Sequence, residues 1–268
     1  MTDRYAVIGN PIGHSRSPDI HAAFAQQTGQ AIDYQRLLGG LDSFADDIQA
    51  FRAAGGKGLN VTVPFKEQAY ALADQVSSRA QAAKAVNTLI FQEDGIQGDN
   101  TDGVGLVRDL TLNHQCNLAG ARILLLGAGG AARGVLLPLL QTEPTCLVIA
   151  NRTASKAHDL ATTANSPAVT GGGLDELNGQ TFEIIINATA AGLQGEVPSI
   201  PAGCLAPGGW TYDMLYAQQA TAFVRWGQQH GAAKTLGGWG MLVEQAAESF
   251  RLWRGVTPDT TSVIHSLR

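Results

Sequence analysis

The sequence predicts an α/β protein with two domains. In the N-terminal third, strand-like runs alternate with helical stretches, and this βαβα order is typical of a mostly parallel sheet. Near the middle, a strand-like run at 122–126 leads through a glycine-rich turn into a helical pattern, which indicates a Rossmann-like βα unit. The chain has 268 residues, of which 44% are apolar, enough to bury one large or two medium cores. We expect two domains.

The first half has strand-like runs that end at turn residues. A helix should begin at SPD (17–19), with Ser17 as its N-cap, proline at its first position and aspartate in its first turn. Apolar residues at 44, 48 and 51 are spaced as on one face of a second helix. Strands are expected at 5–8, 32–38, 58–63 and 86–91, with a short one within 93–103, and helices from 17, at 42–53 and from 104.

The second half has strand-like runs at distances suited to βαβ units. In the last segment, Leu242, Ala246, Phe250 and Trp253 lie on one helical stripe, and Gln245 falls off it. We expect this stripe to pack in a core. The strands expected in this half are 122–126, 146–150, 183–187 and 210–214. Helices are expected after the glycine turn, at 154–163 and within 237–255.

The turn after 122–126 has the sequence GAGGAA. Gly127, Gly129 and Ala132 fit the G-x-G-x-x-G/A pattern, in which small residues permit the turn, the approach of a pyrophosphate and tight packing of helix on strand. Such a pattern is weak by itself in a chain with 32 glycines, but the flanking strand and helix are the required context. The sequence therefore predicts a dinucleotide site at a helix N-terminus.

The end of the next strand distinguishes between two dinucleotides. An NAD site normally places Asp or Glu there to accept the ribose 2′-hydroxyl, whereas a 2′-phosphate needs a cation and neutral donors. This chain has Asn151, Arg152 and Thr153 there, with Lys156 one turn later, so we predict NADP(H). The alternative is that NRTASK is an ordinary helix start capped by Thr153, with solvated charges.

The composition argues against several kinds of partner. A net charge of −5 without a basic cluster disfavours nucleic acid and anionic membranes. No run approaches the about 18 apolar residues of a spanning helix, and the N-terminus lacks the apolar core of a signal peptide, so we expect a cytoplasmic protein.

Cys116, Cys146 and Cys204 are isolated, and the six histidines form no HExxH, so neither disulfides nor a metal is expected.

Small polar residues gather beside the expected helix starts and strand ends of the first half. Ser15 and Ser17 flank the start of the first helix, a suitable place for a carboxylate, although capping explains Ser17 equally well. Thr62 and Lys66 lie where a strand ends at a proline, the region in which α/β sheets bind ligands. The alternative for Lys66 is an ordinary lysine on the surface.

A second polar cluster borders the strand at 86–91 and the helix expected from 104. Its members are Asn87, Asn100, Thr101 and Asp102, and the alternative reading is turn chemistry, with Thr101 or Asp102 capping that helix. In the second half, NATAAG (187–192) follows a buried strand, and its small side chains let a ligand approach the backbone.

Taken in order, SRS, NVTVPFK, AVNTL, GDNTDG, GAGGAARG, NRT, NATAAG, DMLY and GMLVEQA resemble the shikimate dehydrogenase family over nearly the whole chain. The resemblance implies reversible, NADPH-dependent reduction of 3-dehydroshikimate to shikimate, on the route to chorismate and the aromatic amino acids. It also implies an α/β substrate domain formed by residues 1–103 and 238–268, a Rossmann-like NADP domain formed by 104–237, and a cleft between them.

The resemblance assigns roles residue by residue. Lys66 and Asp102 match the catalytic pair. The substrate contacts it implies are Ser15, Ser17, Thr62, Asn87, Asp102, Tyr216 and Gln245. The cofactor contacts it implies are Gly127, Ala128, Gly129, Gly130, Ala131, Asn151, Arg152, Thr153, Ala154, Ser155, Lys156, Met214 and Gly238. Ala132 and Ala190 depart from the family, which often has serine at both positions, and they suggest lost hydroxyl contacts near the cofactor.

Three other readings of the chain differ in what they require. A quinate/shikimate dehydrogenase shares Lys66 and Asp102 and often accepts NAD. The NRT segment at 151–153 argues against this enzyme, because it favours NADP. A catalytically silent nucleotide-binding protein on the same fold has no need of Lys66 and Asp102. An amino-acid or methylene-folate type dehydrogenase lacks the SRS carboxylate site. The expected partner is a small-molecule substrate, and both a monomer and a homodimer are compatible with the sequence.

Overall fold

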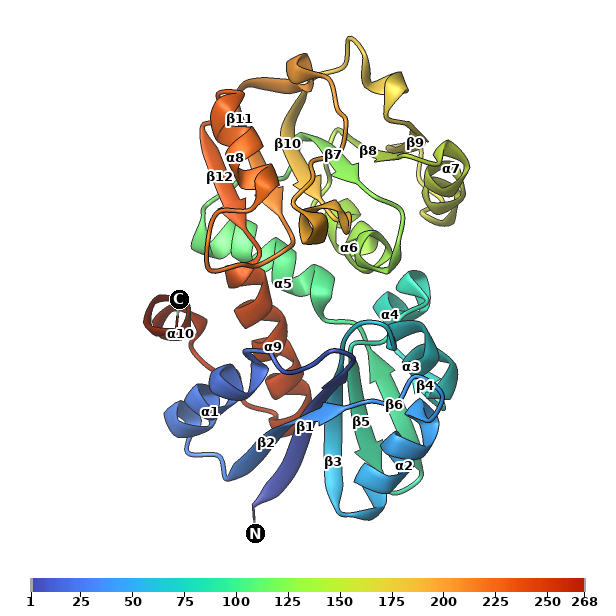
Figure 1. Ribbon diagram of the computed structural model, residues 1–268, viewed down its shortest axis with the longest axis vertical. Helices are drawn as coiled ribbons and strands as arrows, with labels where there is room; N and C mark the ends of the chain where they lie inside the picture. The colour runs from blue at the N-terminus through green and yellow to red at the C-terminus, as the bar shows by residue number, and fades with distance from the viewer. Residues whose placement is uncertain (1, 268) are drawn as a thin grey trace. The chain divides into compact units, whose positions relative to one another are not determined.

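The computed structural model describes residues 2–267 and confirms the α/β class (Figure 1). The chain divides into two compact units: Met1–Gly105 with Val243–Arg268, here called unit 1, and Leu106–Leu242, called unit 2. This division places residues 104–105 in unit 1 and 238–242 in unit 2, a few positions from the domain limits expected above. Each unit has its own sheet and its own core.

Unit 1 contains a six-stranded sheet in the order β2-β1-β3-β5-β6-β4. Strands β2, β1 and β3 are parallel, since β1 pairs in parallel with both β2 and β3. Strand β5 is antiparallel to β3 and β6, and β4 is parallel to β6. The strands are β1 (Asp3–Gly9), β2 (Ile32–Leu38), β3 (Gly56–Val61), β4 (Gln75–Val76), β5 (Thr88–Gln92) and β6 (Gly95–Asp99).

Helices cover both faces of this sheet (Figure 1). Adjacent residues of a strand point to opposite faces, so Ala6 lies in a core cluster with Phe44 and Ile48, while Tyr5 stacks on Trp253 with ring centroids 4.6 Å apart. The helices are α1 (Ser17–Thr28), α2 (Phe44–Ala53), α3 (Lys66–Leu72), α4 (Ser78–Ala83) and α10 (Thr260–Ser266), and α5 (Asp102–Arg108) and α9 (Trp239–Arg254) belong to both units in sequence.

Unit 2 contains a six-stranded, fully parallel sheet in the order β12-β11-β10-β7-β8-β9. This is the strand order of the doubly wound dinucleotide-binding fold, with the reversal between β7 and β10. Its elements are β7 (Arg122–Leu126), α6 (Gly130–Leu140), β8 (Cys146–Asn151), α7 (Ala154–Thr163), β9 (Val169–Gly173), β10 (Phe182–Asn187), β11 (Leu205–Asp213), α8 (Ala222–Gln229), β12 (Lys234–Gly237) and a π-helix at Asp109–Asn113.

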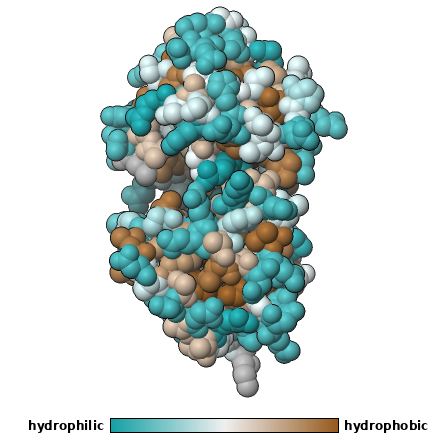
Figure 2. All heavy atoms as spheres, turned by 90° about the vertical axis from the view of Figure 1, so that its right-hand side faces the viewer, coloured by the Kyte–Doolittle hydropathy of each residue, from teal (hydrophilic) through white to brown (hydrophobic). Residues whose placement is uncertain are grey.

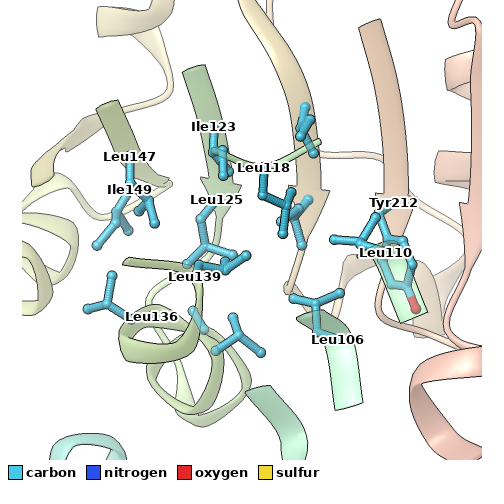
Figure 3. Close-up of a cluster of buried hydrophobic side chains, with 14 of the residues drawn as sticks. Leu106, Leu110, Leu118, Ile123, Leu125, Leu136, Leu139, Leu147, Ile149 and Tyr212 are labelled. Atoms are coloured by element: carbon cyan, nitrogen blue, oxygen red, sulfur yellow. The ribbon is translucent and has the colours of Figure 1, made fainter. Parts of the chain in front are cut away.

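The core of unit 2 is built from apolar strand residues and the helices that cover them. Figure 3 shows Ile123 and Leu125 of β7 facing Leu136 and Leu139 of α6, with Tyr212 of β11 at the far side of the same cluster. The Tyr212 hydroxyl donates to the buried carboxylate of Asp109 at 2.7 Å. Leu124 and Ile185, on the opposite face of the same sheet, belong to a second cluster with Phe223, so the apolar runs that predicted buried strands are packed on both faces.

Two expectations about helix starts are wrong. Arg16, rather than Ser17, is at the N-cap of α1, and Ser17 is the first helical residue, whose N–H donates to the Ser15 hydroxyl at 3.3 Å. Helix α5 begins at Asp102 instead of Val104. In α7 the N-cap position is Thr153, but its side chain makes no capping hydrogen bond.

The surface is mixed in character. On the face shown in Figure 2, hydrophilic side chains cover most of the molecule, and apolar atoms appear between them in patches. Among residues 2–267, no helix has the length and apolar character needed to cross a membrane. The same residues contain no group of three or more His, Cys, Asp and Glu side chains arranged to hold a metal ion.

Candidate active site

Lys66 and Asp102 form a close ion pair in unit 1. The Lys66 Nζ donates to the Asp102 Oδ2 at 2.6 Å, and the two side chains are 25% and 10% exposed. Most of the surface of the pair is therefore removed from water. An ammonium held in this way can donate a proton to an oxygen that gains negative charge.

Local structure places these two charges. Val61 ends β3, Pro64 follows in a cis peptide bond with Val63, and Lys66 is the first residue of α3. Asp102 is the first residue of α5, three residues after the end of β6. Both side chains thus leave the sheet where a strand ends, the region in which α/β sheets bind ligands.

Asn87 joins this pair to helix α9. Its amide Nδ2 lies 2.8 Å from the Asp102 Oδ1, 2.9 Å from the Thr101 Oγ1 and 3.3 Å from the Gln245 Oε1. Asn87 and Thr101 are almost fully buried, and Gln245 is 9% exposed. The structure therefore brings together four predicted site residues: Lys66, Asn87, Asp102 and Gln245.

Asn60, which was not among the predicted site residues, is the centre of a second hydrogen-bonded group. Its Nδ2 donates to the Ser249 Oγ at 3.0 Å and approaches the Thr88 Oγ1 at 3.2 Å, while its Oδ1 accepts from the Tyr34 hydroxyl at 2.7 Å. Asparagine is unusual inside a strand, so the N of NVTVPFK was a usable signal. Ser249 gave no signal, because a serine among apolar helix residues is common.

Tyr34 extends this group to the start of α1. Its ring stacks on His21 of that helix with centroids 4.1 Å apart, and burial raises the Tyr34 pKa well above its usual value. Ser17 is buried and Ser15 is partly exposed. Thr62 is partly exposed just beyond β3, where its N–H donates to the carbonyl of Ile8. Unit 1 thus holds every predicted substrate contact except Tyr216.

A buried ion cluster supports the segment that carries Asp102. Arg79 donates from Nε and Nη2 to the two carboxylate oxygens of Asp99 at 2.6 and 2.8 Å. The same Nη2 donates to the Glu248 Oε1 at 3.0 Å. Glu248 lies one turn after Gln245 on α9. Arg79 therefore links the end of β6 to the part of α9 that faces Asn87.

In unit 2, the glycine turn between β7 and α6 leaves room for a ligand. Gly127 has a φ of 108°, in the region that favours glycine, and a Cβ there would lie 3.1 Å from the Ala188 carbonyl oxygen. A Cβ at Gly129 would meet nothing within 4 Å, and Gly129 and Ala131 are exposed. Ala132 is fully buried in the core. No side chain caps α6, so its first N–H groups can receive a phosphate.

The residues after β8 present a cation to solvent. Arg152, Thr153, Ser155 and Lys156 are exposed, and among the described residues Arg152 and Lys156 make no ion pair. The Asn151 Nδ2 donates to the carbonyl of Thr153 at 3.0 Å, which shapes the turn. Ala154 begins α7. This arrangement suits a 2′-phosphate better than a free 2′-hydroxyl, which requires an acceptor.

Met214 and Gly238 come together after β11 and β12. A Cβ at Gly238 would lie 2.2 Å from the Met214 carbonyl oxygen, so only glycine fits there. Asp213, which the sequence analysis did not single out, accepts from the Asn187 Nδ2, the Leu215 N–H and the Thr221 hydroxyl. Burial raises the pKa of the Asp213 carboxyl, and these hydrogen bonds oppose the rise.

The remaining predicted substrate contact, Tyr216, belongs to unit 2. It is partly exposed and lies near Trp239, with ring centroids 6.5 Å apart. All thirteen predicted cofactor residues, from Gly127 to Gly238, also lie in unit 2. Strands β7 and β8 are adjacent and parallel. The turn at 127–131 comes at the end of β7, and the segment at 151–156 comes at the end of β8. Both therefore lie at one edge of the sheet.

Three family models match successive parts of the chain. The model for the shikimate dehydrogenase substrate binding domain matches residues 7–89. The shikimate/quinate 5-dehydrogenase model matches 109–194, and the shikimate 5′-dehydrogenase C-terminal domain matches 238–268. The middle model covers both shikimate and quinate enzymes, so it does not separate them.

Full-length relatives agree with these matches. A protein of Nitrosococcus oceani described as shikimate dehydrogenase (NADP(+)) is 55% identical, over 100% of this chain and 96% of its own. The crystal structure of an Ael1 enzyme from Pseudomonas putida has a TM-score of 0.94 and 47% identity, covering 99% of this chain and 98% of that one. Shikimate 5-dehydrogenase from Thermus thermophilus, solved with NADP(H) and shikimate, has a TM-score of 0.87 and 32% identity, with 98% and 97% covered.

Proposed function

The chain belongs to the shikimate dehydrogenase family, and from this premise we propose that it catalyses the reversible, NADPH-dependent reduction of 3-dehydroshikimate to shikimate. In this role it supplies the route to chorismate and the aromatic amino acids. The observation that carries the proposal is the Lys66–Asp102 ion pair, held at the strand ends of unit 1 and largely removed from water. Binding of a nucleotide alone does not require such a pair.

Lys66 acts on the oxygen at which the chemistry occurs. When bound, the reduced dinucleotide supplies the hydride to the ketone carbon. The Lys66 ammonium lies by the ketone oxygen, stabilises the negative charge that develops there and donates the proton. In the direction of oxidation, Lys66 accepts that proton again. Asp102 orients the Lys66 ammonium through their 2.6 Å contact and contacts the substrate hydroxyl.

The other predicted residues hold the reactants. Ser15 and Ser17 bind the substrate carboxylate beside the N-terminus of α1. The remaining substrate contacts are Thr62, Asn87, Tyr216 and Gln245. The turn at 127–131 receives the pyrophosphate, 151–156 receives the 2′-phosphate, and Met214 and Gly238 contact the nicotinamide end. Residues 1–103 with 238–268 act as the substrate domain and 104–237 as the NADP domain. We also propose a cytoplasmic protein that is a monomer or a homodimer.

The decisive experiment measures four oxidation rates: shikimate and quinate, each with NADP⁺ and with NAD⁺, followed by the absorbance of the reduced nicotinamide. We expect activity with shikimate and NADP⁺ only, because the end of β8 offers Arg152 and no carboxylate to the ribose. Strong activity with quinate or NAD⁺ would place the chain with the quinate/shikimate enzymes. Folded protein that is silent in all four assays would refute the proposed activity.

A further inference from the structure

A charged side chain outside the predicted site holds the loop that carries Ser15. Arg36 lies on β2, and its guanidinium donates twice to the Ser15 carbonyl oxygen, from Nε at 2.9 Å and from Nη2 at 2.6 Å. The Ser15 hydroxyl in turn accepts the Ser17 N–H at 3.3 Å. Arg36 therefore constrains the backbone from which the two predicted carboxylate-binding hydroxyls project.

The same strand also contacts helix α1, which follows this loop. Tyr34 and Arg36 are two residues apart on β2, so they project from the same face of the sheet. Tyr34 stacks on His21 of α1 with ring centroids 4.1 Å apart, and Arg36 donates to the backbone of Ser15. Strand β2 thus contacts both the loop and the helix that it precedes.

The charge of Arg36 is not neutralised by a carboxylate. Arg36 is exposed and makes no ion pair within residues 2–267, and the two contacts to Ser15 use only two of its five N–H donors. Arg16, the other guanidinium of this region, is paired with Asp19 at 2.9 Å. Because Arg36 contacts the same serine whose hydroxyl is predicted to bind the substrate carboxylate, its charge can act on an anion bound at Ser15.

We propose that Arg36 is a positioning and specificity residue for the carboxylate of the substrate. It holds Ser15 in place and supplies the positive charge that favours an anionic substrate over a neutral analogue. The inference rests on the proposed function, since it names the group that selects the substrate carboxylate. Arg36 does not touch the reacting atoms, so it acts on substrate binding and leaves the hydride step unchanged.

The test compares Arg36→Gln and Arg36→Lys with the wild type. Shikimate and its methyl ester serve as substrates with NADP⁺, and calorimetry gives the Kd of shikimate independently of turnover. The matched control is Arg52→Gln, which removes a partly exposed arginine that also donates to a backbone carbonyl of unit 1, that of Gln92. Circular dichroism establishes that each variant is folded.

We expect Arg36→Gln to raise the KM and Kd of shikimate about tenfold, with kcat within about twofold and with a change of less than about threefold for the ester. The dependence of KM on salt should weaken in Arg36→Gln and persist in Arg36→Lys, because lysine keeps the charge. Arg52→Gln should resemble the wild type in every assay.

Two results would overturn the inference: an unchanged Kd in Arg36→Gln, or equal losses for shikimate and its ester. The second result would mean that Arg36 only maintains the fold of the loop. A different result would refute the proposed function: a wild-type protein that binds shikimate but does not oxidise it. In that case the Kd values still decide the role of Arg36.

Discussion

The reactivity expected of Lys66 depends on its ion pair and on its partial burial. A lysine in bulk water would interact weakly with an aspartate at the same distance, because solvent screens the charges. Here the Asp102 carboxylate also accepts from Asn87, so its orientation is fixed by two donors. The direction in which the ammonium points is thus determined before a substrate binds, which favours proton transfer at one defined atom.

Replacement of this lysine tests the proposed mechanism. We expect Lys66→Ala to lower kcat by about two to four orders of magnitude, because it removes the general acid, while the KM of shikimate changes little. Steady-state kinetics of shikimate oxidation measures both constants. Lys57→Ala, an exposed lysine on β3, is the control and should be fully active. Near-normal turnover of Lys66→Ala would remove Lys66 from the mechanism.

His21 links the stability of unit 1 to pH. It is completely buried, stacks on Tyr34 with ring centroids 4.1 Å apart, and within the described residues its ring nitrogens have no hydrogen-bond partner. Burial lowers its pKa to about 3. The unfolded chain, with a histidine pKa of about 6.5, therefore binds this proton more readily than the folded chain.

The free energy of unfolding should consequently fall as the pH falls from about 6.5 towards 3, by about 1.4 kcal/mol per pH unit from this group. Urea denaturation at pH 7.0, 5.5 and 4.5 measures the slope. His21→Phe should flatten it, because phenylalanine fits among the surrounding rings and does not titrate. His158→Gln, at an exposed position, should keep the wild-type slope. Parallel pH curves for His21→Phe and wild type would contradict this account.

At the scale of elements, the ends of strands carry the predicted chemistry, and buried ions hold those ends in place. Arg79 lies in the first turn of α4, Asp99 ends β6, and Glu248 lies in the middle of α9. The three side chains are 20%, 10% and 4% exposed, so each charge depends on its partners for compensation. Removal of one partner from such a cluster is more costly than replacement of the whole cluster.

Arg79→Met should therefore destabilise the protein by about 3 kcal/mol, because it leaves the buried Asp99 carboxylate without its counterion, while Glu248 keeps its ion pair with Arg251 at 2.8 Å. It should also lower kcat/KM, because Arg79 holds residues close to the predicted site. Asp99 precedes Asp102 by three residues, and Glu248 lies one turn from Gln245. Chemical denaturation and kinetics measure the two effects. Arg79→Lys should lose less, as it keeps the charge. Arg4→Met, which removes an exposed contact to Ala54, serves as the control, and equal losses in Arg4→Met and Arg79→Met would refute the argument.

At the scale of the whole molecule, the predicted ligand sites are divided between two separate cores. The glycine turn and the NRT segment depend on the parallel sheet of unit 2, and Lys66, Asn87 and Asp102 depend on the mixed sheet of unit 1. Apart from Tyr216, a predicted substrate contact that lies in unit 2, the two ligands should therefore be recognised by different units, even though the reaction needs both.

Hydrogen exchange with each ligand alone tests this division. NADP⁺ should slow amide exchange at 127–131 and 151–156, because its phosphates accept from those N–H groups. Shikimate alone should slow exchange at 15–17, 62–66 and 100–102. NADP⁺ without the second ligand should leave 62–66 unchanged. Protection of the glycine turn by shikimate alone would contradict the assignment of ligands to units.

The elements best predicted from the sequence have strong local signals. The expected strands 32–38 and 122–126 and the helix 154–163 coincide with β2, β7 and α7. In contrast, β9 (Val169–Gly173) was missed, because VTGGG has little strand propensity and pairs only through its backbone with β8. The two-residue β4 and the short helix α3 were missed for a similar reason, as neither is long enough to show a period.

By itself the sequence determined the α/β class, the glycine turn before α6 and the residue types at each strand end, because propensity, periodicity and turn chemistry act over a few neighbouring residues. Only the tertiary structure decided which polar side chains meet. Lys66 and Asp102 are 36 positions apart, and Asn87 and Gln245 are 158 apart, so sheet order and the packing of α9 bring them together. The roles of Arg36 and Arg79 also follow from the fold. In the sequence each is an ordinary surface-type residue, and the fold places a distant group beside it.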